Sequence, residues 1–494
     1  MGFLSDLLSL AKTGKNASVY FVGIKGTGVC ALAELLKESG VKAAGSDTKE
    51  VFYTNAILKK LGIPYHETFE PSHIGGGIDL VIHSPAYSEE SNAELAEARR
   101  KSIPFVSYPA ALGEYSSLFD SSGIAGVHGK TTTTAMCGCL MHALGIPAQV
   151  LVGSAVANFD GKSTLNQGDK YFIAETCEYR GHFLSFRPSR IVLTSVESDH
   201  QDFFPTYESI RDCFIEYCRL IPPGGELIYC ADDPGAAEVA NVIKNDGNGI
   251  ITIPYGFTAE GDYKINSYRV ENERAYFSLN VLQSAGEFCL RVPGCHQALN
   301  AAAALALASV FVTKEFNGWN EQLFLAQKKA LEEFRGSKRR SEIIGAAGGI
   351  IFMDDYGHHP TAITLTLQGL KKFYPSRRLV VSFMSHTYSR TASLLDKFAA
   401  SLNIADVLFL HKIYASARER FDGTINGKNI YEKVETLRNG TDSLYYFDEP
   451  EDALEPIKNT LKPGDLFLTL GAGNNWPLAF SLFEIFDKAG ESSI

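Results

Sequence analysis

A glycine-rich turn in the first third of the chain could hold the phosphates of a nucleotide. The segment reads Gly126-Val-His-Gly129-Lys130-Thr131, follows an apolar stretch and opens a helical pattern. Glycines let backbone N–H groups approach phosphate oxygens, a lysine supplies a point charge to the terminal phosphates, and a threonine hydroxyl can bind Mg²⁺. The eight-residue consensus for such loops would need a glycine at Ile124, so an ordinary strand–helix turn is the alternative. The sequence favours phosphate binding.

Acidic side chains follow two later strand-like segments. Glu175 ends the apolar run YFIAE, and Glu197, Asp199, His200 and Asp202 follow RIVLTSV. Carboxylates near a phosphate-binding loop are the ligands that Mg²⁺ requires. Several acids at one strand end repel one another unless a cation compensates. We therefore expect a magnesium site here, with a helix-capping glutamate and a solvated acidic loop as the alternatives.

A second glycine-rich loop, Gly23-Ile-Lys-Gly26-Thr-Gly28, follows the first strand-like segment, and Asp47 lies further on. This arrangement imitates a dinucleotide-binding fingerprint with its ribose-binding acid. The spacing is G-x-x-G-x-G rather than G-x-G-x-x-G, so it favours a diphosphate at a helix N-terminus over NAD. A purely structural turn and an NAD-dependent oxidoreductase are the alternatives, although the Lys130 motif argues against the oxidoreductase.

Two polar segments follow strand-like runs in the last third of the chain. DDYGHHP at 354–360 follows GIIFM, and SHTYSR at 385–390 follows LVVSFM. Both fall at carboxyl ends of strands, where open α/β sheets form binding crevices. The adjacent His358 and His359 could bind zinc, but no partner set at zinc spacing is evident, so we do not predict zinc. Cys137 and the nearby Cys139 lie on the apolar side of a helix, where we expect packing.

The elements that must position these motifs are strands that alternate with helices along the whole chain. Strand-like runs separated by helical patterns predict parallel, doubly wound sheets. A chain of 494 residues exceeds one ordinary domain. We predict an α/β protein with three domains, at 1–120, 121–335 and 336–494. The runs AYFSLNVLQ and EFCLRVP in the second domain are expected to pair as strands.

The composition excludes several classes of function. A formal net charge of −11 argues against a nucleic-acid scaffold, which needs a basic surface. Nine cysteines, an odd number without any C-x-x-C, fit reduced thiols in a cytoplasmic protein better than a disulfide framework. No basic leader precedes the first apolar stretch, and no run has the length of a membrane span. We expect small-molecule substrates, no nucleic acid, no membrane, and a monomer or homodimer.

In this order the motifs resemble those of the Mur ligases of bacterial cell-wall synthesis. The similarity includes GIKGTG, HSPAY, GVHGKTTTT, AET, HQALNAAAA, FRGSKRR, DDYGHHPT, SHTYSRT and LGAGNNW. It implies an N-terminal Rossmann-like domain for a UDP-sugar, a central P-loop ATPase-like domain with a mostly parallel sheet, and a C-terminal Rossmann-like domain that brings the amino acid. The implied reaction joins L-alanine to the carboxylate of UDP-N-acetylmuramate, with ATP and through an acyl phosphate, in peptidoglycan precursor synthesis.

Carried over by position, the resemblance assigns residues to four groups. ATP would contact Gly126, His128, Gly129, Lys130, Thr131, Thr132, His296, Asn300, Arg339, Arg340 and Asp354, with Asp355 as the alternative to Asp354. Mg²⁺ would be held by Thr131, Glu175 and His200. The UDP-sugar would approach Gly26, Thr27, Gly28, Asp47 and Ser84. The amino acid would lie near Tyr356, His358, His386 and Arg390, and the catalytic residues would be Lys130, His200 and His358.

The chain departs from the family pattern at several motifs. Gln297 replaces an asparagine, Ala362 replaces a glutamate, Thr387 replaces an arginine, and ETCEYR stands where the family has EADESD. A lost guanidinium removes a bidentate partner for a carboxylate, so the identity of the amine stays open. A related ligase that adds a peptide or a different amino acid in muropeptide recycling, and a nucleotide-binding regulator without turnover, are the alternatives. His358 or His359 would accept the proton of the attacking amine.

Overall fold

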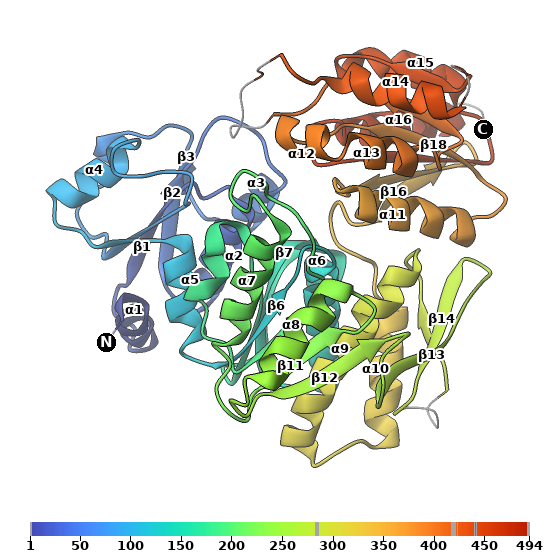
Figure 1. Ribbon diagram of the computed structural model, residues 1–494. Helices are drawn as coiled ribbons and strands as arrows, with labels where there is room; N and C mark the ends of the chain where they lie inside the picture. Colours follow the sequence, from blue (N-terminus) through green and yellow to red (C-terminus); the bar gives the residue numbers. More distant parts are fainter. Residues whose placement is uncertain are drawn as a thin grey trace.

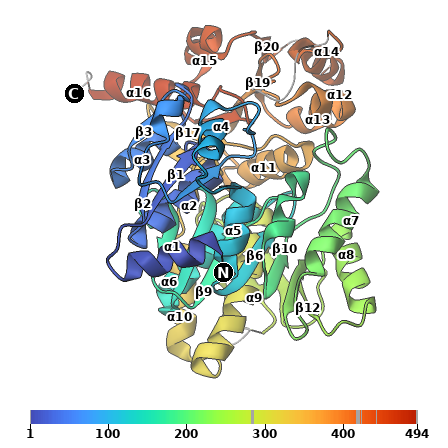
Figure 2. The same ribbon diagram turned by 90° about the vertical axis from the view of Figure 1, so that its left-hand side faces the viewer.

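Three α/β units follow one another along the chain (Figure 1). The computed structural model describes residues 2–281, 286–415, 421, 423–438, 440 and 442–491. Met1 and residues 492–494, the outermost residues of the first and third predicted domains, lie outside this part of the chain. Figures 1 and 2 agree that the C-terminal unit, orange to red, lies above the central unit, while the blue N-terminal unit lies beside it.

The N-terminal sheet has five parallel strands in the order β3-β2-β1-β4-β5. The chain order reverses between β1 and β4, and such a switch point opens a crevice at the carboxyl ends of the strands. The strands are β1 (Ser18–Val22), β2 (Lys42–Ser46), β3 (Tyr65–His66), β4 (Leu80–His83) and β5 (Phe105–Ser107). The helices are α1 (Phe3–Lys12), α2 (Thr27–Glu38), α3 (Thr54–Leu61), α4 (Ala93–Arg100) and α5 (Tyr108–Ser116).

The central sheet has ten strands in the order β15-β14-β13-β12-β11-β10-β6-β9-β7-β8. Parallel pairing runs from β13 through β6 to β7, and the two ends of the sheet are antiparallel. The strands are β6 (Asp120–Ala125), β7 (Ala148–Val156), β8 (Lys162–Asn166), β9 (Tyr171–Glu175), β10 (Arg190–Leu193), β11 (Glu226–Cys230), β12 (Ile251–Gly256), β13 (Tyr263–Glu271), β14 (Arg274–Leu279) and β15 (Phe288–Leu290). The expected pairing of the AYFSLNVLQ and EFCLRVP runs corresponds to β14 and β15.

The helices of the central unit include one with an unusually apolar sequence. They are α6 (Lys130–Leu144), α7 (Tyr207–Cys218), α8 (Pro234–Asn245), α9 (Cys295–Phe316) and α10 (Glu321–Glu332). Among the described helices, α9 alone is long and apolar enough to cross a membrane, but 78% of its most apolar window is buried inside the protein. Its alanines allow close packing against α6. The apolar sequence of α9 is therefore explained by its place in the core of the central unit.

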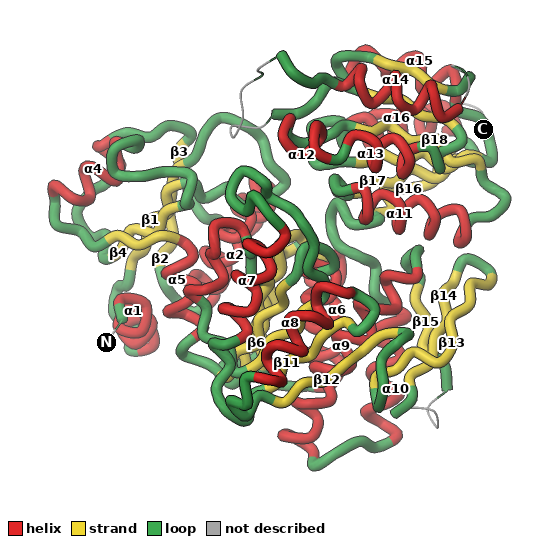
Figure 3. The backbone as a smooth tube through the Cα atoms, in the orientation of Figure 1, coloured by secondary structure: helices red, strands yellow, loops and turns green. Residues whose placement is uncertain are grey.

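The C-terminal sheet has six strands in the order β16-β17-β21-β18-β19-β20, and only β16 runs antiparallel to its neighbour. They are β16 (Glu342–Ala347), β17 (Ile350–Asp355), β18 (Arg378–Phe383), β19 (Val407–Leu410), β20 (Leu444–Tyr446) and β21 (Asp465–Leu470). The helices are α11 (Pro360–Phe373), α12 (Tyr388–Ser393), α13 (Leu395–Leu402), α14 (Gly427–Arg438), α15 (Leu454–Thr460) and α16 (Pro477–Glu491). Figure 3 shows α11 on the side of this unit that faces the central unit, near β13.

Candidate active site

A cavity of about 910 Å³ lies between the central and C-terminal units. One wall comes from the segments that follow β6, β9 and β10, and the other from those that follow β17 and β18. Because the carboxyl ends of parallel strands meet at one edge of a sheet, each unit contributes several polar loops to the same space. The sequence motifs that were expected to carry chemistry therefore converge here from two domains.

The phosphate-loop candidate connects β6 to the N-terminus of α6. Gly129 is the N-cap of α6 with φ +81°, and a Cβ at this position would lie 2.6 Å from Asn300 Oδ1. A side chain would thus be strained by the backbone and blocked by its neighbour, which explains the glycine. His128, Lys130, Thr131 and Thr132 all line the cavity. The free N–H groups at the start of α6 make this wall suitable for an anion.

Lys130 forms a buried ion pair with Glu178. Its Nζ lies 2.9 Å from Glu178 Oε2 and also donates to the backbone carbonyl of Gly126. Burial opposes the charged form of Lys130, but Glu178 together with Cys177 and Glu175 raises the pKa of the lysine above its ordinary value. Burial would likewise raise the pKa of Glu178, but Lys130 and His200 lower it. Glu178 thus holds a charged lysine at the cavity wall, a role that sequence reasoning did not assign.

The three residues expected to hold a metal lie close to this pair. Thr131 Oγ1 donates to Glu175 Oε1 at 3.0 Å, and Glu175 Oε2 accepts from the backbone N–H of Gly153 at 2.7 Å. His200 Nε2 lies 3.5 Å from Glu178 Oε1. The hydroxyl oxygen of Thr131 and the carboxylate oxygens of Glu175, beside a phosphate loop, match the preferences of Mg²⁺. These two residues therefore fit the ion, and His200 would add a nitrogen ligand.

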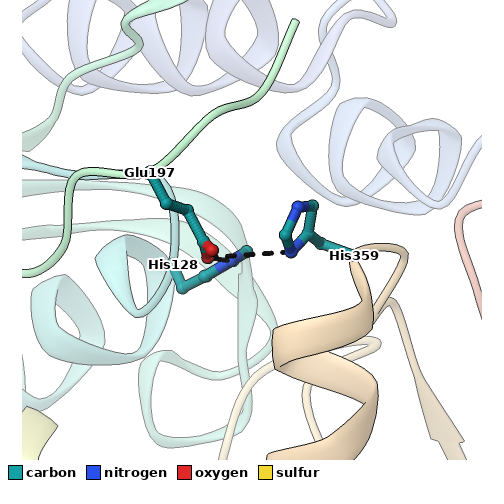
Figure 4. Close-up of side chains that lie close together, drawn as sticks. All are labelled: His128, Glu197 and His359. Carbon is teal, nitrogen blue, oxygen red and sulfur yellow. Dashed lines mark ion pairs between the residues drawn. The ribbon is translucent and has the colours of Figure 1, made fainter. Parts of the chain in front are cut away.

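A second cluster crosses the seam between the domains (Figure 4). His128 of the phosphate loop contacts Glu197 Oε1 through its Nε2, and His359 Nδ1 of the C-terminal unit lies 3.6 Å from the same oxygen. Thr361 Oγ1 donates to Glu197 Oε2 at 3.1 Å. Burial lowers the pKa of His359 to about 4. Sequence reasoning missed this grouping because its three members are far apart in the chain.

Arg390 and its neighbours occupy the C-terminal wall of the cavity, where the amino acid was expected. Tyr356, His358, His386 and Arg390 all line it. The ring of His358 lies 5.2 Å from that of Tyr356 and 6.1 Å from that of His386. Burial, reinforced by the Arg390 guanidinium, keeps the pKa of His358 well below its ordinary value. Thr387, where the family has arginine, is buried and is not among the lining residues.

The remaining nucleotide candidates divide into two sets. His296, Asn300 and Arg340 line the cavity, and burial lowers the pKa of His296 to about 4. Arg339 and Asp354 instead pair with each other, Nε to Oδ2, at 3.0 Å and do not line the cavity. The cavity is lined by Asp355 rather than Asp354. Cys137 and Cys139 are buried in the core on α6, as expected for packing residues.

The UDP-sugar candidates lie at the switch point of the N-terminal sheet. The loop after β1 meets the residue after β4, since a Cβ on Gly23 would lie 2.8 Å from Ser84 Cβ. Gly26 is the N-cap of α2, so Thr27 and Gly28 form its first turn. Asp47 accepts hydrogen bonds from the backbone N–H groups of Lys25 at 2.6 Å and Thr48 at 2.8 Å. These bonds tie the loop to the strand end that carries the acid.

Comparison with known proteins covers all three units. The Mur ligase family catalytic domain matches residues 18–120, the Mur ligase middle domain matches 124–308, and the Mur ligase glutamate ligase domain matches 339–473. The UDP-N-acetylmuramate–L-alanine ligase of Treponema pallidum (strain Nichols) is 48% identical over 480 residues, which cover 97% of this chain and 99% of the relative.

Two further relatives extend this pattern. The enzyme of the same name from Borrelia garinii subsp. bavariensis is 39% identical over 467 residues, or 93% of this chain and 97% of the relative. The solved UDP-N-acetylmuramate-alanine ligase of Thermotoga maritima has a TM-score of 0.76 at 24% identity and covers 96% of this chain and 99% of that chain. This likeness confirms the expected α/β fold with three domains. With family matches in every unit and relatives that align over nearly its whole length, the chain belongs to the Mur ligase family.

Proposed function

We propose that this protein is an ATP-dependent ligase that joins L-alanine to the carboxylate of UDP-N-acetylmuramate in peptidoglycan precursor synthesis. The observation that carries the proposal is the shared cavity, which is lined both by Lys130 of the phosphate loop and by His358 and Arg390 of the C-terminal unit. The names of the Treponema and Borrelia relatives support the same substrates. We propose a cytoplasmic enzyme, monomeric or homodimeric, that acts on small molecules.

The reaction would begin with transfer of the ATP γ-phosphoryl group to the sugar carboxylate. Both groups are anionic and repel each other, so cationic groups must screen the charge. Lys130, released from Glu178, would contact the terminal phosphates, while the N–H groups at the start of α6 bind the remaining oxygens. His296, Asn300 and Arg340 would contact the rest of the nucleotide. We propose Asp355 as an alternative to Asp354 in this set, because it lines the cavity.

Mg²⁺ would be bound by Thr131, Glu175 and His200. When bound, the ion supplies positive charge that stabilises the transferring phosphoryl group. The chain's own contribution is to orient these ligands: Gly153 N–H fixes one oxygen of Glu175, and Glu178 lies beside His200. Loss of either support would leave the ligands free to turn away from the phosphate.

The second step would be attack of the amine on the acyl phosphate. Arg390 would bind the carboxylate of the amino acid, and His358 would accept the proton that the amine releases. The low pKa of His358 keeps its imidazole neutral at physiological pH, as a proton acceptor must be. Closure of the C-terminal unit over the cavity would keep water from the acyl phosphate.

The proposal is tested by measuring ADP release with UDP-N-acetylmuramate and a panel of amines. We expect release only when the sugar is present together with an amine, and faster release with L-alanine than with glycine or serine. The alternative is a recycling enzyme that attaches a peptide. A chain that turns over with a muropeptide-derived tripeptide, and not with L-alanine, would establish that alternative.

A further inference from the structure

We propose that His128, Glu197 and His359 form a binding site for a transition-metal ion of the Zn²⁺ type at the seam between the central and C-terminal domains. Each residue offers one ligand atom, and these atoms all lie within 4.8 Å of one another. Figure 4 shows the three side chains pointing toward a common point from three different segments. All three residues line the active-site cavity, and His128 was expected to contact ATP, but the proposed ligase steps give the three residues no joint role.

The site is partly buried and has unused donor capacity. His359 is only 4% exposed, and its Nδ1, the nitrogen that faces Glu197, accepts a long hydrogen bond of 3.4 Å from the backbone N–H of Thr361. His128 Nε2 is likewise buried without a hydrogen bond of good geometry, although it contacts Glu197. Buried polar atoms are normally satisfied, so His128 Nε2 in this state beside the Glu197 carboxylate leaves capacity for a cationic partner.

The donor set separates this ion from Mg²⁺. Two imidazole nitrogens and one carboxylate oxygen suit zinc and its neighbours in the first transition series, whereas Mg²⁺ prefers sites made mostly of oxygen ligands. The distance of 3.6 Å between His359 Nδ1 and Glu197 Oε1 is compatible with two ligands at the ~2.0–2.2 Å bond lengths of zinc. Three protein ligands would leave a fourth position for water or for an oxygen from the cavity.

An ion held by all three residues would join the two domains. His128 and Glu197 belong to the central unit, whereas His359 is the N-cap of α11 in the C-terminal unit. Binding would therefore stabilise the closed arrangement. This consequence rests on the proposed function: if turnover needs the domains to open, micromolar Zn²⁺ should inhibit the ligase. The binding itself does not depend on the reaction.

Binding is tested with Co²⁺ as a spectroscopic probe, in the presence of excess Mg²⁺ that fills the oxygen-rich site. We expect one equivalent of Co²⁺ to give the intense visible absorption of a tetrahedral site and to be displaced by Zn²⁺. His359→Asn, which keeps a good N-cap, and Glu197→Gln should each weaken binding at least about tenfold. His142→Asn, at an exposed histidine of α6 that pairs with Gln167, is the matched control and should bind as the unsubstituted protein does.

Two results would overturn the proposal. One is the absence of tetrahedral absorption in the unsubstituted protein. The other is unchanged affinity in both His359→Asn and Glu197→Gln, with their folding verified by ATP binding. Because ADP release is measured separately, failure of metal binding would leave the ligase assignment intact, and failure of ligation would leave the metal site intact.

Discussion

Arg390 of the C-terminal domain and Asp199 of the central domain form a buried ion pair. Two guanidinium nitrogens of Arg390, Nε and Nη2, donate to Asp199 Oδ1 at 3.0 and 2.7 Å, and both side chains are 4% exposed. Burial would raise the pKa of Asp199, but Arg390, His200 and His358 together hold it well below its ordinary value. The pair therefore stays charged across the physiological pH range and fixes how the two domains meet.

Breaking this pair should loosen the closed arrangement. Asp199→Asn leaves an uncompensated guanidinium, and loss of one partner of a buried pair costs about 3–5 kcal/mol. We expect a larger radius of gyration by small-angle X-ray scattering and a raised KM for the amino acid. Lys412→Met, which breaks the exposed pair with Glu449, is the control and should change neither quantity. An Asp199→Asn protein as compact as the unsubstituted one would contradict this role.

Lys130→Met should slow the chemical step strongly, and folding must be checked because the buried Glu178 loses its partner. The substitution removes the charge that would contact the transferring phosphoryl group, and loss of one such contact costs about 10²–10³-fold in kcat. Lys170→Met, at an exposed lysine paired with Glu315, should keep full activity. The measurement is the kcat of ADP release at saturating substrates. If the kcat of Lys130→Met stays within a few-fold of that of the unsubstituted enzyme, Lys130 has no role in phosphoryl transfer.

Glu175→Gln should raise the Mg²⁺ concentration required for half-maximal activity. An amide is a weaker ligand than a carboxylate for a hard cation, and the change also disturbs the hydrogen bonds to Thr131 and Gly153. We expect a shift of about 10–100-fold. Excess Mg²⁺ should restore part of the rate, whereas a purely structural defect would not respond to it. An unchanged Mg²⁺ dependence would exclude Glu175 as a ligand.

The buried Glu34 should make the stability of the interface between the first two domains depend on pH. It lies on α2, accepts from Thr164 Oγ1 at 3.0 Å, and burial raises its pKa to about 7. The folded protein holds the proton of Glu34 more tightly than the unfolded chain, in which the pKa of a glutamate is ~4.3. The free energy of unfolding therefore falls as the pH rises from ~4.3 through 7. Glu34→Gln removes this loss.

The gain in free energy of unfolding from Glu34→Gln should be about 1 kcal/mol larger at pH 8.5 than at pH 6. It is measured from thermal unfolding of both proteins at the two pH values. An equal effect of the substitution at both values would show that Glu34 is already ionised in the folded protein.

The residues that sequence analysis identified are those whose roles follow from local motifs. Lys130 and Thr131 could be predicted because their position in a strand–loop–helix segment dictates where they point. The choice between Asp354 and Asp355 could not be predicted. Adjacent residues of a strand face opposite sides of the sheet, and the motif does not say which of the two faces the cavity. Asp354 bonds Arg339, whereas Asp355 lines the cavity.

Contacts across the domain seam were the least predictable part of the site. Asp199 and Arg390 are separated by 191 positions, and their pairing depends on how two separate sheets dock. The same holds for His359, whose partners His128 and Glu197 belong to another domain. Glu178 is local to Glu175, but its contact with Lys130 joins the ends of two neighbouring strands, which one sequence does not reveal.

The acyl phosphate intermediate is tested most directly by following one oxygen atom through the reaction. UDP-N-acetylmuramate labelled with ¹⁸O in its carboxylate is incubated with ATP, Mg²⁺ and L-alanine, and the phosphate released is analysed by mass spectrometry. If the carboxylate attacks the γ-phosphorus and the amine then displaces phosphate from the acyl carbon, each phosphate carries one ¹⁸O from the sugar. Phosphate free of the label, formed together with the amide product, would contradict an acyl phosphate intermediate.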